Sequence, residues 1–189
     1  MDHFVDFIKV SSTLLKEFGE EKIRYAVIGG FALGFWGVTR ATIDMDFLLL
    51  LEDADRADAI LKKHGYTAIF RTENVSRYQS EFSSLGTIDI IYSFRKISRS
   101  MLARSVEVSF AKDLAIVTLI PEDIIGLKIQ AIANDAARTA RDKSDIHALL
   151  DARLKNGGQI DWPLLNEYCS LFDFNDLYEE LRTNHDQAE

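Results

Sequence analysis

The sequence predicts an α+β fold in which a mixed sheet is flanked by helices and is followed by a helical C-terminal part. Three observations support this prediction. Short strand-like runs gather between residues 20 and 120. Apolar residues with helical spacing stand before and between these strands, and every periodic segment after residue 121 reads as helical. We therefore expect an α/β core over residues 1–120 and a helical subdomain over residues 121–189 that packs on it.

The helices are predicted from apolar residues that recur every three or four positions and from the residues that end such runs. Gly19 and Gly65 suit helix ends, and Pro121 suits the first turn of a helix, where proline is tolerated. Gly157-Gly158 separates two C-terminal helices. The expected helices cover residues 3–18, 31–36, 54–64, 98–103, 121–135, 137–154, 162–171 and 173–183.

The strands are predicted from short apolar or alternating runs that turn residues bound on either side. The first strand enters a tight turn at Gly29-Gly30, and the second precedes a turn at Glu52-Asp53. The expected strands cover residues 25–28, 41–50, 66–70, 77–82, 87–92, 106–110 and 114–119.

The composition, with 47% hydrophobic and 28% charged residues, is ordinary for a globular protein. The longest apolar runs, such as Phe47–Leu51, are far too short to span a bilayer, so we expect no membrane partner. The single cysteine, Cys169, excludes an internal disulfide and a cysteine-rich zinc site. Charged residues near the N-terminus argue against a signal peptide. A cytoplasmic protein is the simplest expectation.

Two carboxylates stand two positions apart in the run Arg40-Ala-Thr-Ile-Asp44-Met-Asp46. Side chains alternate on a strand, so Asp44 and Asp46 would share one face. Arg40 and Thr42 would lie on that face too. Like charges this close are costly unless a cation bridges them, and a divalent cation that prefers oxygen ligands would do so. The alternative is a pair of solvent-facing acids on an edge strand.

A third acid, Asp89, stands between isoleucines on a strand that we expect to be largely buried. An unpaired carboxylate is costly there, so we expect Asp89 to face the same cation site from a neighbouring strand. Three carboxylates can hold two metal ions about 3.5–4 Å apart. The alternative is a salt bridge, for instance to Arg40. Arg40 itself could contact a phosphate or pair with Asp44 or Asp46.

The turn Gly29-Gly30 lets backbone N–H groups approach a phosphate, although two glycines also serve in purely structural turns. Taken with Asp44-Met-Asp46 and Asp89, in this order, the turn resembles the signature of the DNA polymerase β-like nucleotidyltransferase superfamily. The string from Gly29 through Arg40 and Thr42 to Asp46 is similar to one branch in particular. That branch includes the nucleotidyltransferase toxins of type IV toxin–antitoxin and abortive-infection systems.

The resemblance implies a nucleotidyltransferase fold over about residues 20–150 and a role for each matched residue. Asp44 and Asp46 would bind both metal ions, and Asp89 would complete the site and assist deprotonation of the acceptor hydroxyl. The phosphates of the nucleotide would be bound by Gly29, Gly30, Arg40, Thr42 and Lys128. Positioning and charge neutralisation are what phosphoryl-type transfer chiefly needs, which agrees with these roles.

The helical half of those toxins often carries a lysine followed by a cluster of basic and acidic residues. Lys128 and the run from Arg138 to Asp145 are similar to this arrangement. Lys128 lies on an apolar helix, where a lysine needs a partner, so it would either neutralise phosphate charge or pair with a buried acid such as Asp145. Arg138, Arg141, Asp142 and Asp145 share one helical face, and the alternative to a functional role is a salt-bridged, solvated face.

We therefore expect an enzyme that moves a nucleoside monophosphate from a nucleoside triphosphate to a hydroxyl acceptor, with Mg²⁺ or Mn²⁺ as its cofactor. The acceptor would be tRNA or a protein, and a toxin would have a cognate antitoxin as partner. A small antibiotic-type acceptor is the first alternative, and it suits a net charge of −8, since nucleic-acid binders are usually basic. A non-catalytic nucleotide-binding module is the second. A purely structural helical adaptor would leave the three carboxylates unexplained.

Overall fold

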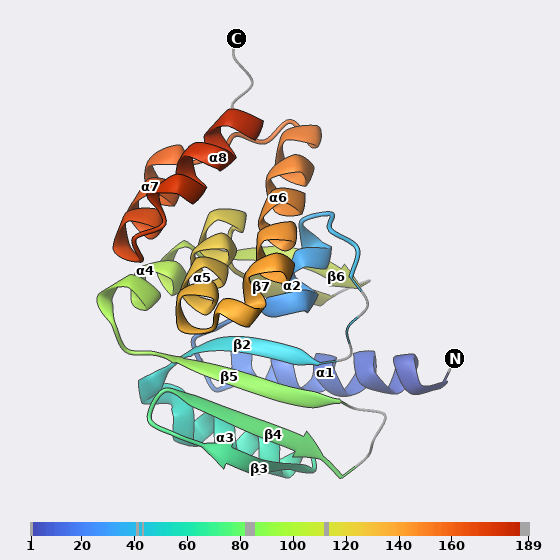
Figure 1. The fold of residues 1–189 in the computed structure, drawn as a ribbon. Helices are drawn as coiled ribbons and strands as arrows, with labels where there is room; N and C mark the ends of the chain where they lie inside the picture. The colour runs from blue at the N-terminus through green and yellow to red at the C-terminus, as the bar shows by residue number, and fades with distance from the viewer. Residues whose placement is uncertain (1, 41, 43, 82–85, 112–113, 186–189) are drawn as a thin grey trace. The chain divides into compact units, whose positions relative to one another are not determined.

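The structure is a computed structural model that describes residues 2–40, 42, 44–81, 86–111 and 114–185. The chain forms two compact units (Figure 1). Unit 1 comprises Met1–Ala32 and Arg40–Leu119, and unit 2 comprises Leu33–Thr39 and Ile120–Glu189. The predicted division at residue 120, and the packing of the helical part on the core, stay predictions.

Unit 1 is built on a seven-stranded mixed sheet with the strand order β3-β4-β5-β2-β1-β7-β6. The central strand β2 pairs antiparallel with β1 and parallel with β5, and β1 also pairs parallel with β7. The strands are β1 (Tyr25–Ile28), β2 (Met45–Leu50), β3 (Tyr66–Arg71), β4 (Val75–Ser80), β5 (Thr87–Ser93), β6 (Val106–Ala111) and β7 (Leu114–Thr118).

Helices α1 (Asp2–Glu20) and α3 (Ala54–Lys63) cover one face of this sheet (Figure 1). The ring of Phe18 on α1 lies 5.9 Å from that of Phe47 on β2, and the hydroxyl of Tyr78 on β4 donates to Asp58 on α3 at 2.9 Å. Because side chains alternate along a strand, Asp46 and Arg77, the neighbours of Phe47 and Tyr78, face away from these helices. The short helices α2 (Gly29–Phe35), η1 (Leu51–Asp53) and α4 (Lys96–Arg104) connect strands.

Unit 2 is helical in its C-terminal part. It contains α5 (Pro121–Asn134), η3 (Ala136–Arg138), α6 (Thr139–Lys155), α7 (Trp162–Leu171) and α8 (Asn175–His185). A Cβ atom on Gly126 would lie 2.7 Å from the ring of Tyr168, so this glycine allows α5 and α7 to approach closely. Cys169 is fully buried and packs as a small apolar side chain. None of the helices in the described part of the chain combines the length and apolar character of a membrane span.

The α+β fold class is confirmed, and most expected elements lie within a few residues of their observed bounds. One boundary affects the site. The strand expected at residues 41–50 begins at Met45, so Asp44 precedes it, while residues 41 and 43 lie outside the described part of the chain. Helix α2 begins at Gly29 rather than at residue 31, so both glycines belong to its first turn.

Candidate active site

Asp46 and Asp89 are direct neighbours in the sheet. Asp46 on β2 is in register with Asp89 on the parallel strand β5 and with Ile28 on β1. Residues in register on adjacent strands point to the same face, so the two carboxylates lie side by side on the face opposite α1 and α3. The sheet therefore places together two acids that are 43 positions apart in the sequence.

Gly29 brings backbone directly against Asp46. Its φ angle is +66°, a conformation that side chains other than glycine rarely adopt. A Cβ atom at this position would lie only 1.9 Å from the Oδ2 atom of Asp46, so the Asp46 carboxylate would have to move to accommodate it. The backbone conformation and the close approach of the Asp46 carboxylate are thus two independent reasons for a glycine at the first residue of α2.

The segment before β2 lies against the second glycine. A Cβ atom on Gly30 would meet the Thr42 side chain at 3.4 Å and Cδ of Arg40 at 3.5 Å. The Oγ1 atom of Thr42 also lies 3.3 Å from the backbone nitrogen of Asp44, which donates to it. Arg40 and Thr42, expected at the phosphate site, are therefore neighbours of the Gly29-Gly30 turn.

Asp44 reaches the same region through hydrogen bonds to β5. Because β2 begins at Met45, Asp44 lies just before the strand, and its shared face with Asp46 stays a prediction. The Oδ1 atom of Asp44 accepts hydrogen bonds from the backbone nitrogen and the hydroxyl of Thr87, at 3.1 and 3.0 Å. Thr87 is two positions before Asp89 on β5, so Asp44 is tied to the strand that carries the third acid.

The carboxylate of Asp89 is paired and partly exposed, on a strand that we expected to be largely buried. Its side chain is 28% exposed, and Arg77 on the adjacent strand β4 binds both of its carboxylate oxygens. The Nε atom of Arg77 donates to Oδ1 at 2.6 Å and a terminal nitrogen donates to Oδ2 at 2.8 Å. A salt bridge was the alternative that the sequence left open for Asp89, and Arg77 provides one.

The pKa of Arg77 is affected by all three acids of the candidate site. Its pKa is raised above the ordinary value for arginine, first by the hydrogen bonds to Asp89 and by that carboxylate's charge, and further by the charges of Asp44 and Asp46. Sequence reasoning missed Arg77. The alternation of Ser76, Arg77 and Tyr78 indicates a strand but not the strand that will pair with it.

The three carboxylates are oxygen ligands of the kind that Mg²⁺ and Mn²⁺ prefer. In the part of the chain that the structure describes, however, no three aspartate, glutamate, histidine or cysteine side chains stand ready to hold a metal ion. Both oxygens of Asp89 instead accept hydrogen bonds from Arg77. The donor set suits the metal in its chemistry, but its present arrangement is that of an ion pair.

The same fold occurs in several solved structures. The lincosamide antibiotic adenylyltransferase LnuA, bound to lincomycin, matches with a TM-score of 0.53 and 18% identity over 75% of this chain and 94% of its own. ANT(2″)-Ia in complex with adenylyl-2″-tobramycin matches with a TM-score of 0.64 and 13% identity over 89% of this chain and 97% of its own. An antigenic nucleotidyltransferase-like protein from Paracoccidioides brasiliensis matches with a TM-score of 0.52 and 16% identity over 76% and 74%.

This chain has the nucleotidyltransferase fold. The expectation from the sequence motifs is thereby confirmed at the level of the fold. No protein-family model and no curated protein sequence matches the chain. The likeness to the toxin branch of the superfamily stays a prediction.

Unit 2 of this nucleotidyltransferase fold holds Lys128 in a network of acids. Its ammonium group donates to Oδ1 of Asp142 at 3.0 Å and to Oδ2 of Asp145 at 2.6 Å. The side chain of Lys128 is 9% exposed and that of Asp142 is fully buried. Pairing with an acid such as Asp145 was one of the two roles that the sequence left open for Lys128. A role in phosphate binding stays a prediction.

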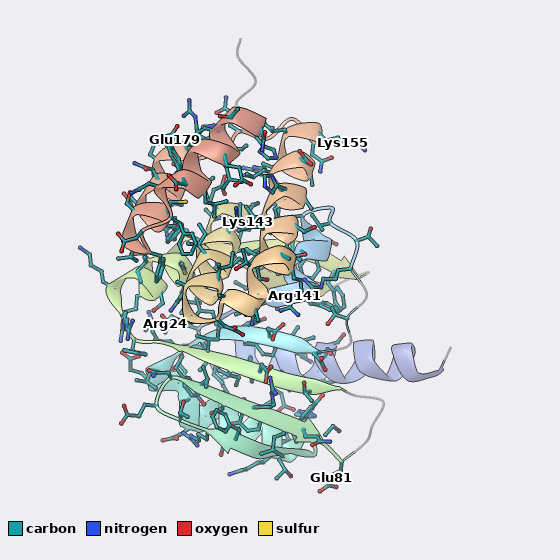
Figure 2. All side chains as sticks on the ribbon, viewed as in Figure 1. Arg24, Glu81, Arg141, Lys143, Lys155 and Glu179 are labelled. Atoms are coloured by element: carbon teal, nitrogen blue, oxygen red, sulfur yellow. The ribbon has the colours of Figure 1, made fainter. Side chains whose placement is uncertain are left out.

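Arg138 and Arg141 belong to the same network. Arg138 donates to Oδ2 of Asp142 at 2.8 Å, and Arg141 lies 3.9 Å from its Oδ1 atom. Burial by itself would raise the pKa of Asp142, but the hydrogen bonds from Arg138 and Lys128 outweigh it and lower the pKa below the ordinary value. Figure 2 marks Arg141 together with Lys143 and Lys155 along α6. The shared face is thus salt-bridged, although its central acid is buried rather than solvated.

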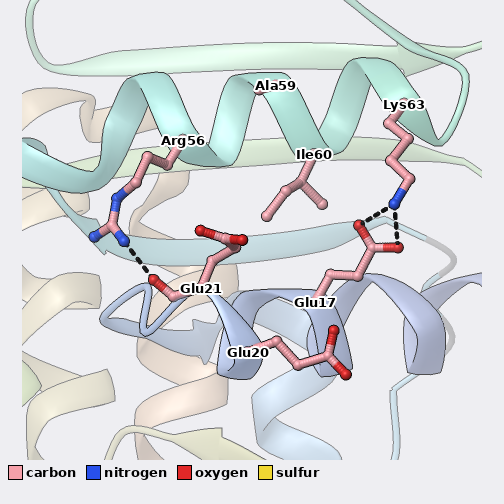
Figure 3. A pocket seen from close by; sticks show the side chains of 7 residues that line it. All are labelled: Glu17, Glu20, Glu21, Arg56, Ala59, Ile60 and Lys63. Carbon is pink, nitrogen blue, oxygen red and sulfur yellow. Dashed lines mark hydrogen bonds and ion pairs between the residues drawn. The ribbon is translucent and has the colours of Figure 1, made fainter.

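A hollow of about 390 Å³ lies between α1 and α3, on the helix-covered side of unit 1 (Figure 3). Lys63 binds both carboxylate oxygens of Glu17 at 3.0 Å, and Arg56 donates to the backbone oxygen of Glu21. Of the charged side chains that line the hollow, Lys63 and Glu17 bind each other, and the sheet separates the hollow from Asp46 and Asp89. We do not assign a ligand to it.

Proposed function

We propose that this protein transfers a nucleoside monophosphate from a nucleoside triphosphate to a hydroxyl acceptor. The observation that carries the proposal is the close approach of Gly29 to Asp46, with Asp89 in register beside it. A backbone turn that only glycine can occupy stands next to two adjacent carboxylates, on a fold shared with adenylyltransferases. Such a site brings phosphate-binding N–H groups and cation-binding oxygens to one place.

Asp44, Asp46 and Asp89 are the residues that would hold Mg²⁺ or Mn²⁺. Bound ions would neutralise the triphosphate and the charge that develops during transfer. The turn at Gly29-Gly30 would present its N–H groups to the phosphates. Arg40 and Thr42, which lie against that turn, would add a cation and a hydroxyl donor.

The reaction balances without a further reactant. The acceptor oxygen forms a new bond to the α-phosphorus, the bond from that phosphorus to the bridging oxygen breaks, and pyrophosphate leaves. A carboxylate oxygen of Asp89 would take the proton of the acceptor hydroxyl. The role of the chain is to hold the reacting groups in line and to stabilise charge, which accounts for most of the catalysis of such transfers.

Two classes of acceptor have separate support. The resemblance to toxins favours tRNA or a protein as acceptor, with a cognate antitoxin as partner in a cytoplasmic setting. The net charge of −8 disfavours a general nucleic-acid surface. Two of the similar solved structures are complexes with lincomycin and with adenylyl-2″-tobramycin. These observations favour a small hydroxylated acceptor, so a single experiment should offer both classes.

The test is incubation with each α-³²P-labelled nucleoside triphosphate and Mg²⁺, in the presence of total RNA, cell lysate or a panel of aminoglycosides and lincosamides. We expect label to move to one acceptor class, and the transfer to stop when EDTA is added. The Asp46→Asn variant serves as the inactive control. Binding of triphosphate without transfer to any acceptor would favour the non-catalytic module instead.

A further inference from the structure

Arg77 is the basic residue that the structure pairs with Asp89 of the candidate site. It lies on β4 in register with Asp89 on β5, which is in register with Asp46 on β2. The three side chains therefore form a row across three adjacent strands, on the face opposite α1 and α3. Arg77, at one end of the row, binds both carboxylate oxygens of Asp89 in the middle.

This ion pair is open to solvent. The side chain of Arg77 is 55% exposed and that of Asp89 is 28% exposed. Water screens such a pair, and the pair adds little to the stability of a fold. A guanidinium can therefore leave Asp89 without stranding a buried charge, and a divalent cation that binds several carboxylates at once offers Asp89 a stronger partner.

We propose that Arg77 is the resident counter-ion of the three-acid site and competes with the divalent cation for Asp89. Without the cation, Arg77 compensates the charge of the acids and keeps both oxygens of Asp89 engaged. When the cation binds, Arg77 releases Asp89. Arg77 is thus a positioning residue that sets the cation affinity of the site, and this inference rests on the proposed function.

The test measures Mn²⁺ binding directly, by calorimetry and by electron paramagnetic resonance, with and without a non-hydrolysable triphosphate analogue. In Arg77→Gln the guanidinium is gone and Asp89 is free, so we expect Mn²⁺ to bind about tenfold more tightly than in the wild type. Arg77→Lys, which keeps the charge but not the two-pronged geometry, should give a smaller gain. Adding Asp89→Asn to Arg77→Gln should abolish the gain.

Arg71→Gln is the matched control. Arg71 on β3 pairs with Asp55 on α3 at 3.1 Å, so this variant removes the same charge from the helix-covered side of the sheet and leaves Asp89 paired. We expect its Mn²⁺ affinity to equal that of the wild type. A similar gain in Arg71→Gln and Arg77→Gln would show a general charge effect and overturn the inference.

The remaining outcomes separate this inference from the proposed function. Unchanged or weaker Mn²⁺ binding in Arg77→Gln, with Mn²⁺ binding and nucleotide transfer intact in the wild type, would overturn the role of Arg77 alone. It would mean that Arg77 holds Asp89 in place for the metal. If neither protein bound Mn²⁺ with or without the analogue, both the role of Arg77 and the metal-dependent function would be wrong.

Discussion

The Arg77–Asp89 pair of unit 1 and the Lys128 network of unit 2 use the same chemistry in opposite surroundings. Arg77 is 55% exposed and pairs with one carboxylate on the sheet face opposite α1 and α3. Lys128 is 9% exposed and is held between Asp142, which is fully buried, and Asp145. Water can take the place of either partner in the Arg77–Asp89 pair, but it cannot do so in the buried Lys128 network. Access to solvent thus separates a cluster that can exchange partners with a ligand from one whose loss would damage the fold.

The largest expected effect concerns the acids of the candidate site in unit 1. Asp46→Asn should lower the rate of nucleotide transfer about a thousandfold, because the variant removes a cation ligand beside the reacting phosphate. Its melting temperature without metal should be unchanged or higher, since repulsion between neighbouring acids is relieved. Asp55→Asn changes the same charge on exposed α3 and should transfer normally. Wild-type turnover in Asp46→Asn would exclude a two-metal site at these acids.

The corresponding variant in the buried network of unit 2 is Lys128→Met. Removal of the ammonium leaves Asp142 and Asp145 without their shared partner, and we expect a loss of about 3 kcal/mol in the free energy of unfolding. The loss should fall at the low end of the usual range, because Arg138 still binds Asp142. Chemical denaturation measures it, and a triphosphate titration on the same protein measures nucleotide affinity.

Lys143→Met provides the control for that variant. Lys143 pairs with Glu180 at 2.8 Å but is 33% exposed, so its removal should cost less than about 1 kcal/mol. If Lys128→Met kept wild-type stability and bound triphosphate more weakly, Lys128 would belong to the phosphate site that the family resemblance implies. The distinction drawn from burial would then fail.

Gly29→Ala tests whether the candidate site depends on the backbone conformation at Gly29. An alanine with φ near +66° costs about 1–2 kcal/mol, and its methyl group would overlap the Asp46 carboxylate. We expect lower stability together with a loss of transfer. Gly19→Ala is the control, since a Cβ atom there meets nothing within 4 Å and α1 should gain slightly. A fully active Gly29→Ala protein would mean that the phosphates bind elsewhere.

The smallest effect concerns pH. The pKa of Asp142 is lowered in the folded protein from its ordinary value of 3.8, so the folded state binds fewer protons than the unfolded state near that pH. The stability that Asp142 contributes is therefore complete above about pH 4 and is lost as the pH falls through the lowered value. Urea unfolding between pH 2 and 5 should show a steeper loss in the wild type than in Asp142→Asn. Parallel curves would mean that Asp142 is not coupled to folding.

Local sequence signals were sufficient for the elements and for part of the site. The run Tyr25–Ile28 was predicted as a strand with its observed bounds, because four apolar residues before two glycines favour a buried strand and a tight turn. The pair Gly29 and Asp46 was also singled out. Glycine conformation and carboxylate chemistry are properties of the residue itself and can be read without knowing its neighbours.

Only the tertiary structure decided which charged groups meet. Arg77 binds Asp89, and Lys128 binds Asp142 and Asp145, because strand register and helix packing bring together positions that are 12 to 17 residues apart. The start of β2 at Met45 likewise depends on its pairing with β1 and β5. Electrostatic partners are set by distance and by access to water, and both arise only when the sheet and the helices have packed. The sequence alone thus determined the elements, the glycine turn and the acids, and packing assigned each charge its partner.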